Sequence, residues 1–247
     1  MAMSAVAIIP ARYASTRLPG KPLLDRTGKY LIKHVVEAVQ PARRIERVVV
    51  ATDDERIAHA VGSFGGEVVM TSADCRSGTD RLAQAAERLC LPGDQIVVNV
   101  QGDEPEIPAD CIDRLVELLE TSGADMATLA TPLRPDQIGD TNRVKVVCDR
   151  NGNALYFSRS GIPFDRDGTG QAGYLLHLGI YAYRVKFLYH YAALPSTPLE
   201  QAEKLEQLRA LEHGYRIAVG IVDYDGAGID TPEDYAAFVR RWMGKHG

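Results

Sequence analysis

The sequence predicts an α/β fold with a mostly parallel central sheet and helices on both of its faces. Two observations support this prediction: short apolar runs alternate with amphipathic segments, and the first four runs are apolar nearly throughout. Strands that are apolar on both faces are typical of a parallel sheet covered by helices. The chain has 247 residues, of which 45% are hydrophobic and 25% charged, so it can bury a sizeable core without crosslinks.

Four strands and four helices are expected in the first half of the chain. Each strand is a short run of apolar residues, and the first helix carries apolar residues at a spacing that places them on one face. Residues 52–55 can cap the second helix, and Gly65-Gly66 can end it. The expected strands are residues 5–9, 47–51, 67–70 and 95–100, and the expected helices are residues 31–39, 55–64, 78–91 and 108–120.

The pattern changes beyond about residue 126. Asn151-Gly152 lies between two short apolar runs and predicts a hairpin, and Thr231-Pro232 is a strong helix start. The expected elements are a hairpin of residues 144–148 and 154–157, strands 177–184 and 217–222, and helices 198–213 and 232–243. Because the last strand and helix resemble the first units, we expect one domain over residues 1–247 with one continuous, embellished sheet.

Charge and composition exclude several classes of protein. Lys and Arg number 28 against 33 Asp and Glu, so the formal net charge is −5, which argues against a nucleic-acid partner. No run approaches the roughly 18 apolar residues of a membrane span, and the N-terminus lacks a signal-peptide layout. The four cysteines form no C-x-x-C pair and are expected to be reduced. We therefore expect a cytoplasmic protein without membrane insertion.

The loop at residues 10–22 follows the first expected strand and is basic in an otherwise acidic chain. Arg12, Arg17 and Lys21 lie within ten residues, and the first 24 residues contain no Asp or Glu. Because ligands of parallel sheets bind at the carboxyl ends of strands, these cations predict a phosphate site. The loop is not a P-loop, since a proline stands where Ser or Thr should ligate magnesium. The alternative is a solvated basic loop.

Two carboxylates are candidates for a magnesium site at the same edge of the sheet. Asp103 follows the fourth expected strand, and Gly102 before it would let the backbone approach a ligand closely. Magnesium prefers one or two carboxylates together with phosphate oxygens and water. Asp230 stands one residue before the cap at Thr231, so the helix start does not explain it. The alternative is a polar turn with solvated carboxylates, and Asp230 alone is a weak signal.

Seven motifs occur in order along the chain, and together they resemble a known family. They are PARYASTRLPGKPL from Pro10, SGTDR from Ser77, VNVQGDEP from Val98, LYFSR from Leu155, HLGIYAYR from His177, LEQLR from Leu205 and IDTPED from Ile229. The family is that of the 3-deoxy-manno-octulosonate cytidylyltransferases, or CMP-Kdo synthetases. The resemblance implies a Rossmann-like nucleotide-diphospho-sugar transferase fold. It places a CTP-binding core at about 1–125 and 216–247, and a smaller mixed sugar-binding and dimerisation subdomain at about 126–215.

The resemblance also implies a reaction. CTP and 3-deoxy-D-manno-octulosonate (Kdo) would give pyrophosphate and CMP-Kdo, the activated sugar for lipopolysaccharide synthesis, by Mg²⁺-assisted in-line attack of the anomeric hydroxyl on the α-phosphorus. By resemblance, Arg17 and Lys21 hold the β- and γ-phosphates, Asp103 and Asp230 carry the magnesium, and these four are the catalytic residues. The CTP site is implied at Ala11, Arg12, Arg17, Lys21, Ser77, Gly78 and Asp103.

The sugar acid has a carboxylate and many hydroxyls, so its pocket should mix cations with hydrogen-bonding groups. By the family's pattern this site consists of Arg81, Gln101, Arg159, His177, Tyr181 and Glu206. This chain has Cys75-Arg76 where many members carry a histidine two residues before Ser-Gly-Thr, and its loop at residues 165–173 is short. The resemblance further implies a homodimer, with the apolar, tyrosine-rich segment 174–194 as its contact.

Two other interpretations stay open at this point. One is a cytidylyltransferase for another sugar acid, such as a CMP-sialate synthetase, or for an alditol phosphate. Such enzymes share the phosphate loop and the metal carboxylates but lack the YFSR and HLGIY runs. The other is a non-catalytic nucleotide-binding protein on the same scaffold. The presence of both carboxylates and of the phosphate-binding cations argues against it.

Overall fold

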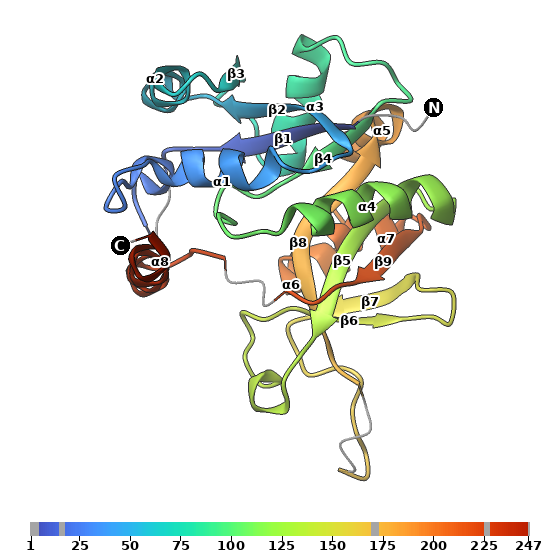
Figure 1. Ribbon diagram of the computed structural model, residues 1–247. Helices are drawn as coiled ribbons and strands as arrows, with labels where there is room; N and C mark the ends of the chain where they lie inside the picture. Colours follow the sequence, from blue (N-terminus) through green and yellow to red (C-terminus); the bar gives the residue numbers. More distant parts are fainter. Residues whose placement is uncertain (1–4, 15–17, 169–172, 225–227, 247) are drawn as a thin grey trace.

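The computed structural model describes residues 5–14, 18–168, 173–224 and 228–246, and its centre is one mixed sheet (Figure 1). Within the described residues the sheet has nine strands, and seven of them follow one another from edge to edge. In that order they are β3 (Glu67–Met70), β2 (Ile45–Thr52), β1 (Ala5–Ala11), β4 (Ile96–Asn99), β8 (Leu175–Arg184), β5 (Met126–Pro132) and β9 (Ile217–Ile221). The α/β class and the single continuous sheet are confirmed.

Strand direction places the functional loops at one edge of this sheet. The pairs β1–β2, β1–β4, β2–β3 and β5–β9 are parallel, whereas β8 runs antiparallel to both β4 and β5. The register pairs Asn99 with Tyr181 and Pro132 with Leu175. The beginning of β8 therefore lies beside the carboxyl ends of the parallel strands, where ligands of such sheets bind.

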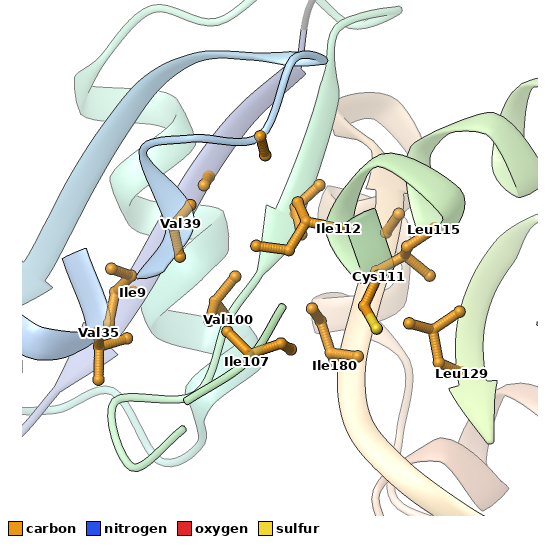
Figure 2. Close-up of a cluster of buried hydrophobic side chains, with 14 of the residues drawn as sticks. Ile9, Val35, Val39, Val100, Ile107, Cys111, Ile112, Leu115, Leu129 and Ile180 are labelled. Atoms are coloured by element: carbon orange, nitrogen blue, oxygen red, sulfur yellow. The ribbon is translucent and has the colours of Figure 1, made fainter. Parts of the chain in front are cut away.

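Helices cover both faces of the sheet. The first apolar cluster joins it to α1 (Leu31–Val39), α2 (Glu55–Ser63) and α4 (Ala109–Ser122). Figure 2 shows Ile112 and Leu115 of α4 among Val100, Leu129 and Ile180. The second cluster joins the opposite face to α3 (Gly78–Arg88), α5 (Val185–Ala193) and α7 (Gln207–Glu212). None of the helices in the described ranges is both long and apolar enough to cross a lipid bilayer.

Two peripheral elements complete the site's surroundings. The hairpin of β6 (Lys145–Cys148) and β7 (Ala154–Ser158) joins the sheet through β8, and Gly152 makes its turn with a φ of 79°. The last helix, α8 (Pro232–His246), packs through Phe238 and Tyr235 against Leu18 and Leu31. This contact brings the end of the chain back to the loop after β1. The four cysteines carry no disulfide, as expected.

Two parts of the fold differ from the sequence-based expectation. Strand β5 and helix α5 were not predicted. The helix expected at 198–213 is two helices, α6 (Pro198–Glu203) and α7, because Lys204 adopts a left-handed conformation with φ of 55° and ends α6. The segment 174–194, expected to form a dimer contact, contains the central strand β8 and the buried Tyr183 and Tyr191, and a contact of its exposed residues with a second copy stays a prediction.

A buried lysine ties the hairpin to the loop before it. Lys145 is fully buried, and its Nζ donates to the carbonyl oxygens of Asp140, Arg143 and Arg159 at 2.9, 2.6 and 2.6 Å. Burial lowers the pKa of this lysine. A buried ammonium is tolerated only when its protons are satisfied, and three carbonyl oxygens satisfy them here.

We expect Lys145→Met to lower the free energy of unfolding by about 3 kcal/mol, because it leaves the carbonyl oxygens around it without a donor. Urea unfolding followed by circular dichroism measures this loss. Lys186→Met, at an exposed position of α5, is the matched control and should change the same free energy by less than about 0.5 kcal/mol. Equal losses in the two variants would contradict the structural role of Lys145.

Candidate active site

Three cavities meet at the edge of the sheet where β1 and β4 end, and Gln101 lines all of them. The loop cavity, about 230 Å³, lies between residues 10–12 and 75–78. The main cleft, about 730 Å³, lies between the loop after β4, the start of α8 and residues 140–144. The inner cavity, about 140 Å³, lies beneath Gln101 and beside α7. This arrangement offers separate places for two substrates around one centre.

Lys21, Asp103 and Asp230 form that centre. Lys21 Nζ donates to Asp103 Oδ2 at 2.8 Å, to the carbonyl of Ile229 at 2.8 Å and to Asp230 Oδ1 at 3.4 Å. The side chains of Lys21, Asp103 and Asp230 are 15%, 27% and 46% exposed, so the lysine is the most buried of the three. The structure thus brings together three of the four predicted catalytic residues. The fourth, Arg17, lies outside the described residues.

The local backbone explains how these groups meet. A Cβ atom at Gly102 would lie 3.1 Å from the carbonyl oxygen of Pro10, so glycine is needed for the loop after β4 to pass the end of β1. The backbone N–H of Ile229 donates to the Asp103 carbonyl at 2.9 Å. Two segments more than 120 residues apart are thereby held against each other, and each carries one of the carboxylates.

The start of α8 orients Asp230. Asp234 Oδ2 accepts hydrogen bonds from the backbone N–H groups of Asp230 and Thr231, at 3.1 and 2.9 Å, and from the Thr231 hydroxyl at 2.9 Å. Thr231 Oγ1 in turn accepts from the Asp234 N–H at 3.2 Å, as expected of an N-cap. Asp234 therefore serves the helix start, and this leaves the Asp230 carboxylate directed at Lys21.

Glu104 also belongs to the site, although the sequence analysis considered it only as a solvent-exposed carboxylate of a polar turn. Its carboxyl accepts a hydrogen bond from Tyr224 Oη at 2.8 Å, and a Cβ at Gly228 would lie 3.3 Å from its Oε1. Burial, reinforced by the negative charge of Asp103, raises the pKa of Glu104 to about 7. No signal in the sequence separates it from Asp103, because both directly follow the same strand.

The two carboxylates fit a magnesium ion that is completed by a substrate. Asp103 and Asp230 both lie within 3.4 Å of the one Lys21 nitrogen, so a single cation already contacts both. Across the part of the chain that the structure describes, no three acidic, histidine or cysteine side chains gather as a metal site. Since magnesium takes few protein ligands and keeps phosphate and water oxygens, this sparse donor set suits it.

The loop cavity contains the expected nucleotide residues Ala11, Arg12, Ser77 and Gly78. Ser77 caps α3 by accepting from the Asp80 N–H at 3.1 Å, so the positive end of a helix dipole opens into this cavity.

Arg81 and Cys75 line the same cavity. Arg81, assigned by resemblance to the sugar, is buried, contacts the Thr71 hydroxyl and forms an ion pair with Asp53 at 3.3 Å. Burial raises the pKa of the Cys75 thiol, which keeps it protonated. Arg81 is thus placed nearer to the predicted nucleotide site than to the main cleft.

The other predicted sugar residues divide between two cavities. Gln101 donates to the Gly179 carbonyl at 3.1 Å, and His177 lines the main cleft. Tyr181 and Glu206 line the inner cavity. Arg159 lines none of the three, and its guanidinium donates instead to the carbonyls of Glu203 at 2.8 Å and Thr141 at 3.0 Å. Its role toward the sugar stays a prediction.

Two cations that the sequence analysis did not select line the main cleft. Arg143 lies 3.9 Å from Asp140, and Arg241 on α8 donates from Nε to Glu106 at 3.0 Å. Neither stands in a motif, and only the packing of α8 and of the loop before β6 brings them to the cleft. Arg143 and Arg241 would attract the anionic groups of a ligand in this cleft.

His177 is held as a neutral imidazole. Its Nε2 lies 3.1 Å from Thr128 Oγ1, and its ring packs between Phe157 and Tyr181, with centroids at 4.9 and 5.5 Å. Burial lowers the pKa of His177 to about 3. The ring can therefore donate or accept one hydrogen bond toward a ligand at neutral pH but cannot supply a positive charge.

The low pKa of His177 makes the free energy of unfolding depend on pH. Below about pH 6.5 the unfolded chain protonates His177 while the folded protein does not, so the free energy of unfolding falls as the pH decreases. Between about pH 7 and pH 5 we expect the free energy of unfolding of His177→Asn to fall by about 1–2 kcal/mol less than that of wild type. Urea unfolding of both proteins at these two pH values tests it, and identical losses would contradict a neutral His177 in the folded protein.

Arg12 and Lys21 beside two carboxylates that suit magnesium, at the edge of an α/β sheet, are typical of a nucleotidyltransferase. Comparison with known families narrows the class. The chain matches the sequence model of the family described as Cytidylyltransferase over residues 6–217, and it belongs to that family.

The chain is similar to curated relatives along nearly its whole length. A 3-deoxy-manno-octulosonate cytidylyltransferase of Syntrophobacter fumaroxidans is 55% identical over 96% of both chains. One of Thermodesulfovibrio yellowstonii is 48% identical over 94% of this chain and 95% of the relative. An 8-amino-3,8-dideoxy-manno-octulosonate cytidylyltransferase of Shewanella halifaxensis is 52% identical over 94% and 96%.

Solved structures agree with this family. The structure of CMP:2-keto-3-deoxy-manno-octonic acid synthetase in complex with CTP has a TM-score of 0.92, 43% identity, and coverage of 99% of this chain and 100% of that chain. A cytidylyltransferase of Leptospira borgpetersenii, with a TM-score of 0.63 and 21% identity over 96% and 85%, shares the fold. The nucleotidyltransferase fold predicted from the motifs is confirmed.

Proposed function

We propose that this protein transfers the cytidylyl group of CTP to Kdo, with release of pyrophosphate. The observation that carries the proposal is the contact of Lys21 with both Asp103 and Asp230, which line the main cleft, while the loop cavity adjoins the cleft at Gln101. The names of the relatives support both substrates. In the reaction the anomeric oxygen forms a bond to the α-phosphorus, the bond to the pyrophosphate breaks, and the hydroxyl proton is lost to solvent.

CTP would lie along the loop cavity toward Lys21. Ser77 and Gly78 at the start of α3 would face the base, and Ala11 and Arg12 would lie beside the nucleotide, as their positions in the cavity allow. Arg17 belongs to this part of the proposal through its motif alone. The cations would neutralise the charge that develops on the departing pyrophosphate, a largely electrostatic contribution.

Asp103 and Asp230 would hold magnesium. When bound, the metal supplies charge neutralisation for the triphosphate and activation of the attacking hydroxyl. In the structure without substrate, Lys21 neutralises the same two carboxylates. If a metal bound Asp103 and Asp230, the Lys21 ammonium would be free to donate to phosphate oxygens. The lysine thereby keeps the two acids close together before substrate binds, and it changes acceptors when substrate arrives.

Pyrophosphate release tests the proposal. We expect turnover with CTP, Kdo and magnesium together, little with ATP, GTP or UTP, and little with the sialic acid N-acetylneuraminate in place of Kdo. Equal turnover with sialic acid would favour the broader sugar-acid interpretation. Absence of turnover with every sugar acid would favour a nucleotide-binding protein without catalysis.

A second candidate substrate is 8-amino-3,8-dideoxy-manno-octulosonate. Relatives that carry its name are 52% and 50% identical to this chain, which is within the range of those named for Kdo. The same assay with both sugars decides between them. A higher kcat/KM for the amino sugar would make it the preferred substrate, while the reaction would still be cytidylyl transfer from CTP.

We also propose that the protein works as a cytoplasmic homodimer. The four unpaired cysteines support a reducing compartment. Phe164 is 86% exposed on residues 159–168 after β7, which project from the sheet in Figure 1. We expect light scattering after gel filtration to give twice the monomer mass, and Phe164→Ser to weaken the assembly. A monomer at micromolar concentration would contradict the proposal.

A further inference from the structure

Tyr13 joins two described parts of the loop at residues 10–22. Its carbonyl oxygen accepts a hydrogen bond from the Gly20 N–H at 3.2 Å. Its ring lies so close to Gly20 that a Cβ atom there would come within 3.3 Å of three atoms of the tyrosine side chain. Gly20 also has a φ of 66°, a conformation that favours glycine. Since Arg12 precedes Tyr13 and Lys21 follows Gly20, this contact fixes the backbones of the two cations relative to each other.

Arg56 stacks on the ring of Tyr13 from the neighbouring helix α2. Its guanidinium carbon lies 3.4 Å from the ring centroid, which is a cation–π contact. The same guanidinium binds the carboxylate of Asp54 through two nitrogens, Nε to Oδ1 at 3.0 Å and Nη2 to Oδ2 at 2.6 Å. Asp54 is the N-cap of α2, and its Oδ1 also accepts from the Arg56 N–H at 2.9 Å. The arginine is therefore held in one orientation over the tyrosine.

The sheet brings these two segments together. Strands β1 and β2 are parallel neighbours, and Ala11 pairs with Thr52. Tyr13 and Asp54 each stand two residues beyond this pair. Thr52 is fully buried, and its hydroxyl accepts from the Asp54 N–H at 3.2 Å, which fixes the start of α2 at the end of β2. The stack of Arg56 on Tyr13 is thus anchored to the sheet.

The two stacked side chains stand outside the places assigned to the substrates. Neither Tyr13 nor Arg56 is among the described residues that line the loop cavity, the main cleft or the inner cavity. Arg56 is 59% exposed, and an exposed ion pair such as that with Asp54 adds little to stability. Arg12, in contrast, lines the loop cavity, and Lys21 contacts both carboxylates of the main cleft. The stack therefore acts on residues of the site without belonging to its lining.

We propose that Tyr13 and Arg56 are positioning residues for the triphosphate of CTP. Their stack holds the loop so that Arg12 and Lys21 both reach the nucleotide. This inference rests on the proposed function and adds to it how the loop is prepared for CTP. A binding loop that is held in shape before its ligand arrives saves the cost of ordering it on binding. Loss of the stack should therefore weaken the binding of CTP and leave that of the sugar acid unchanged.

The test compares variants that remove the stack with one that keeps it. Arg56→Met removes the cation and Tyr13→Leu removes the aromatic face, whereas Tyr13→Phe retains that face. We expect Kd for CTP, measured by calorimetry with magnesium and without sugar, to rise about three- to tenfold in the first two variants and to stay unchanged in Tyr13→Phe. KM for Kdo should be the same in all of them.

Two further variants make the test specific. Arg114→Met changes an exposed arginine of α4 that pairs with Glu117, and as the matched control it should bind CTP like wild type. Because Arg56 and Tyr13 are in direct contact, the double variant Arg56→Met/Tyr13→Leu should bind CTP at most about twofold more weakly than the weaker single variant. Fully additive losses would mean that the two side chains act separately, and would contradict the stack.

Unchanged affinity for CTP in folded Arg56→Met and Tyr13→Leu would overturn the inference, and lower melting temperatures in the same variants would then assign the stack to stability alone. Equal losses in Tyr13→Phe and Tyr13→Leu would also overturn it, because the hydroxyl and not the ring would matter. If Tyr13→Leu does not fold, the exposed Arg56→Met decides. Wild type that binds CTP but transfers no cytidylyl group would refute the proposed function and leave these comparisons valid, and wild type that binds no CTP would refute both.

Discussion

Asp103→Asn is expected to lower kcat by about a thousandfold or more while leaving the fold intact. The change keeps the size of the side chain but removes one of the two charges that would hold magnesium, and loss of such a metal costs several kcal/mol of transition-state stabilisation. The backbone carbonyl of Asp103, which accepts from Ile229, is unaffected by the substitution. Pyrophosphate release at saturating CTP, Kdo and magnesium measures the effect.

Two controls accompany this prediction. Asp136→Asn changes an exposed aspartate, 69% accessible, whose partner is the surface residue Arg134, and it should leave kcat unchanged. The thermal melting temperature of Asp103→Asn should stay within a few degrees of wild type. A folded Asp103→Asn protein with near-native kcat would show that Asp103 does not hold the metal.

Lys21→Met is expected to lower kcat/KM for CTP by about a hundredfold or more, while KM for Kdo stays the same. The ammonium is the only described side-chain cation that contacts both Asp103 and Asp230, and in the proposed reaction it neutralises the leaving group. Initial rates at varied CTP and at varied Kdo separate the two effects. A change in the preference among sugar acids would contradict the role of Lys21 in phosphate binding.

The same variant has a signature that does not depend on turnover. Without the lysine, two carboxylates face each other uncompensated, so added magnesium should raise the melting temperature of Lys21→Met more than that of wild type. Lys33→Met, at a partly exposed position of α1, is the control and should respond to magnesium like wild type. An equal response of all three proteins would mean that Lys21 and the metal do not share these carboxylates.

The first half of the fold could be predicted because β1, β4 and the second half of β2 are buried on both faces and are apolar nearly throughout. The run at β4 is fully buried, and the helices around it have one apolar face each. Strand β5 lacks such a signal. Its Thr128 is buried only because the hydroxyl donates to the carbonyls of Leu178 and Ile180, a contact that the local sequence does not encode.

The site could be predicted where residues follow strands or precede helices, and not where distant packing makes them. Lys21, Asp103 and Asp230 stand at such positions, and they converge in the structure. Glu104 gains its place from Tyr224, Arg241 stands on the last helix, and Arg143 reaches the cleft from the loop before β6. The inner cavity depends on one left-handed residue, Lys204, within an otherwise helical pattern.

Phosphorus NMR of a reaction mixture with CTP, Kdo and magnesium tests the central claim most directly. We predict that the triphosphate signals of CTP disappear as one phosphodiester signal of CMP-Kdo and the signal of free pyrophosphate grow in equal amounts, and that Asp103→Asn gives neither. Release of inorganic phosphate in place of pyrophosphate, or pyrophosphate formed equally well without Kdo, would contradict cytidylyl transfer at the Lys21–Asp103–Asp230 centre.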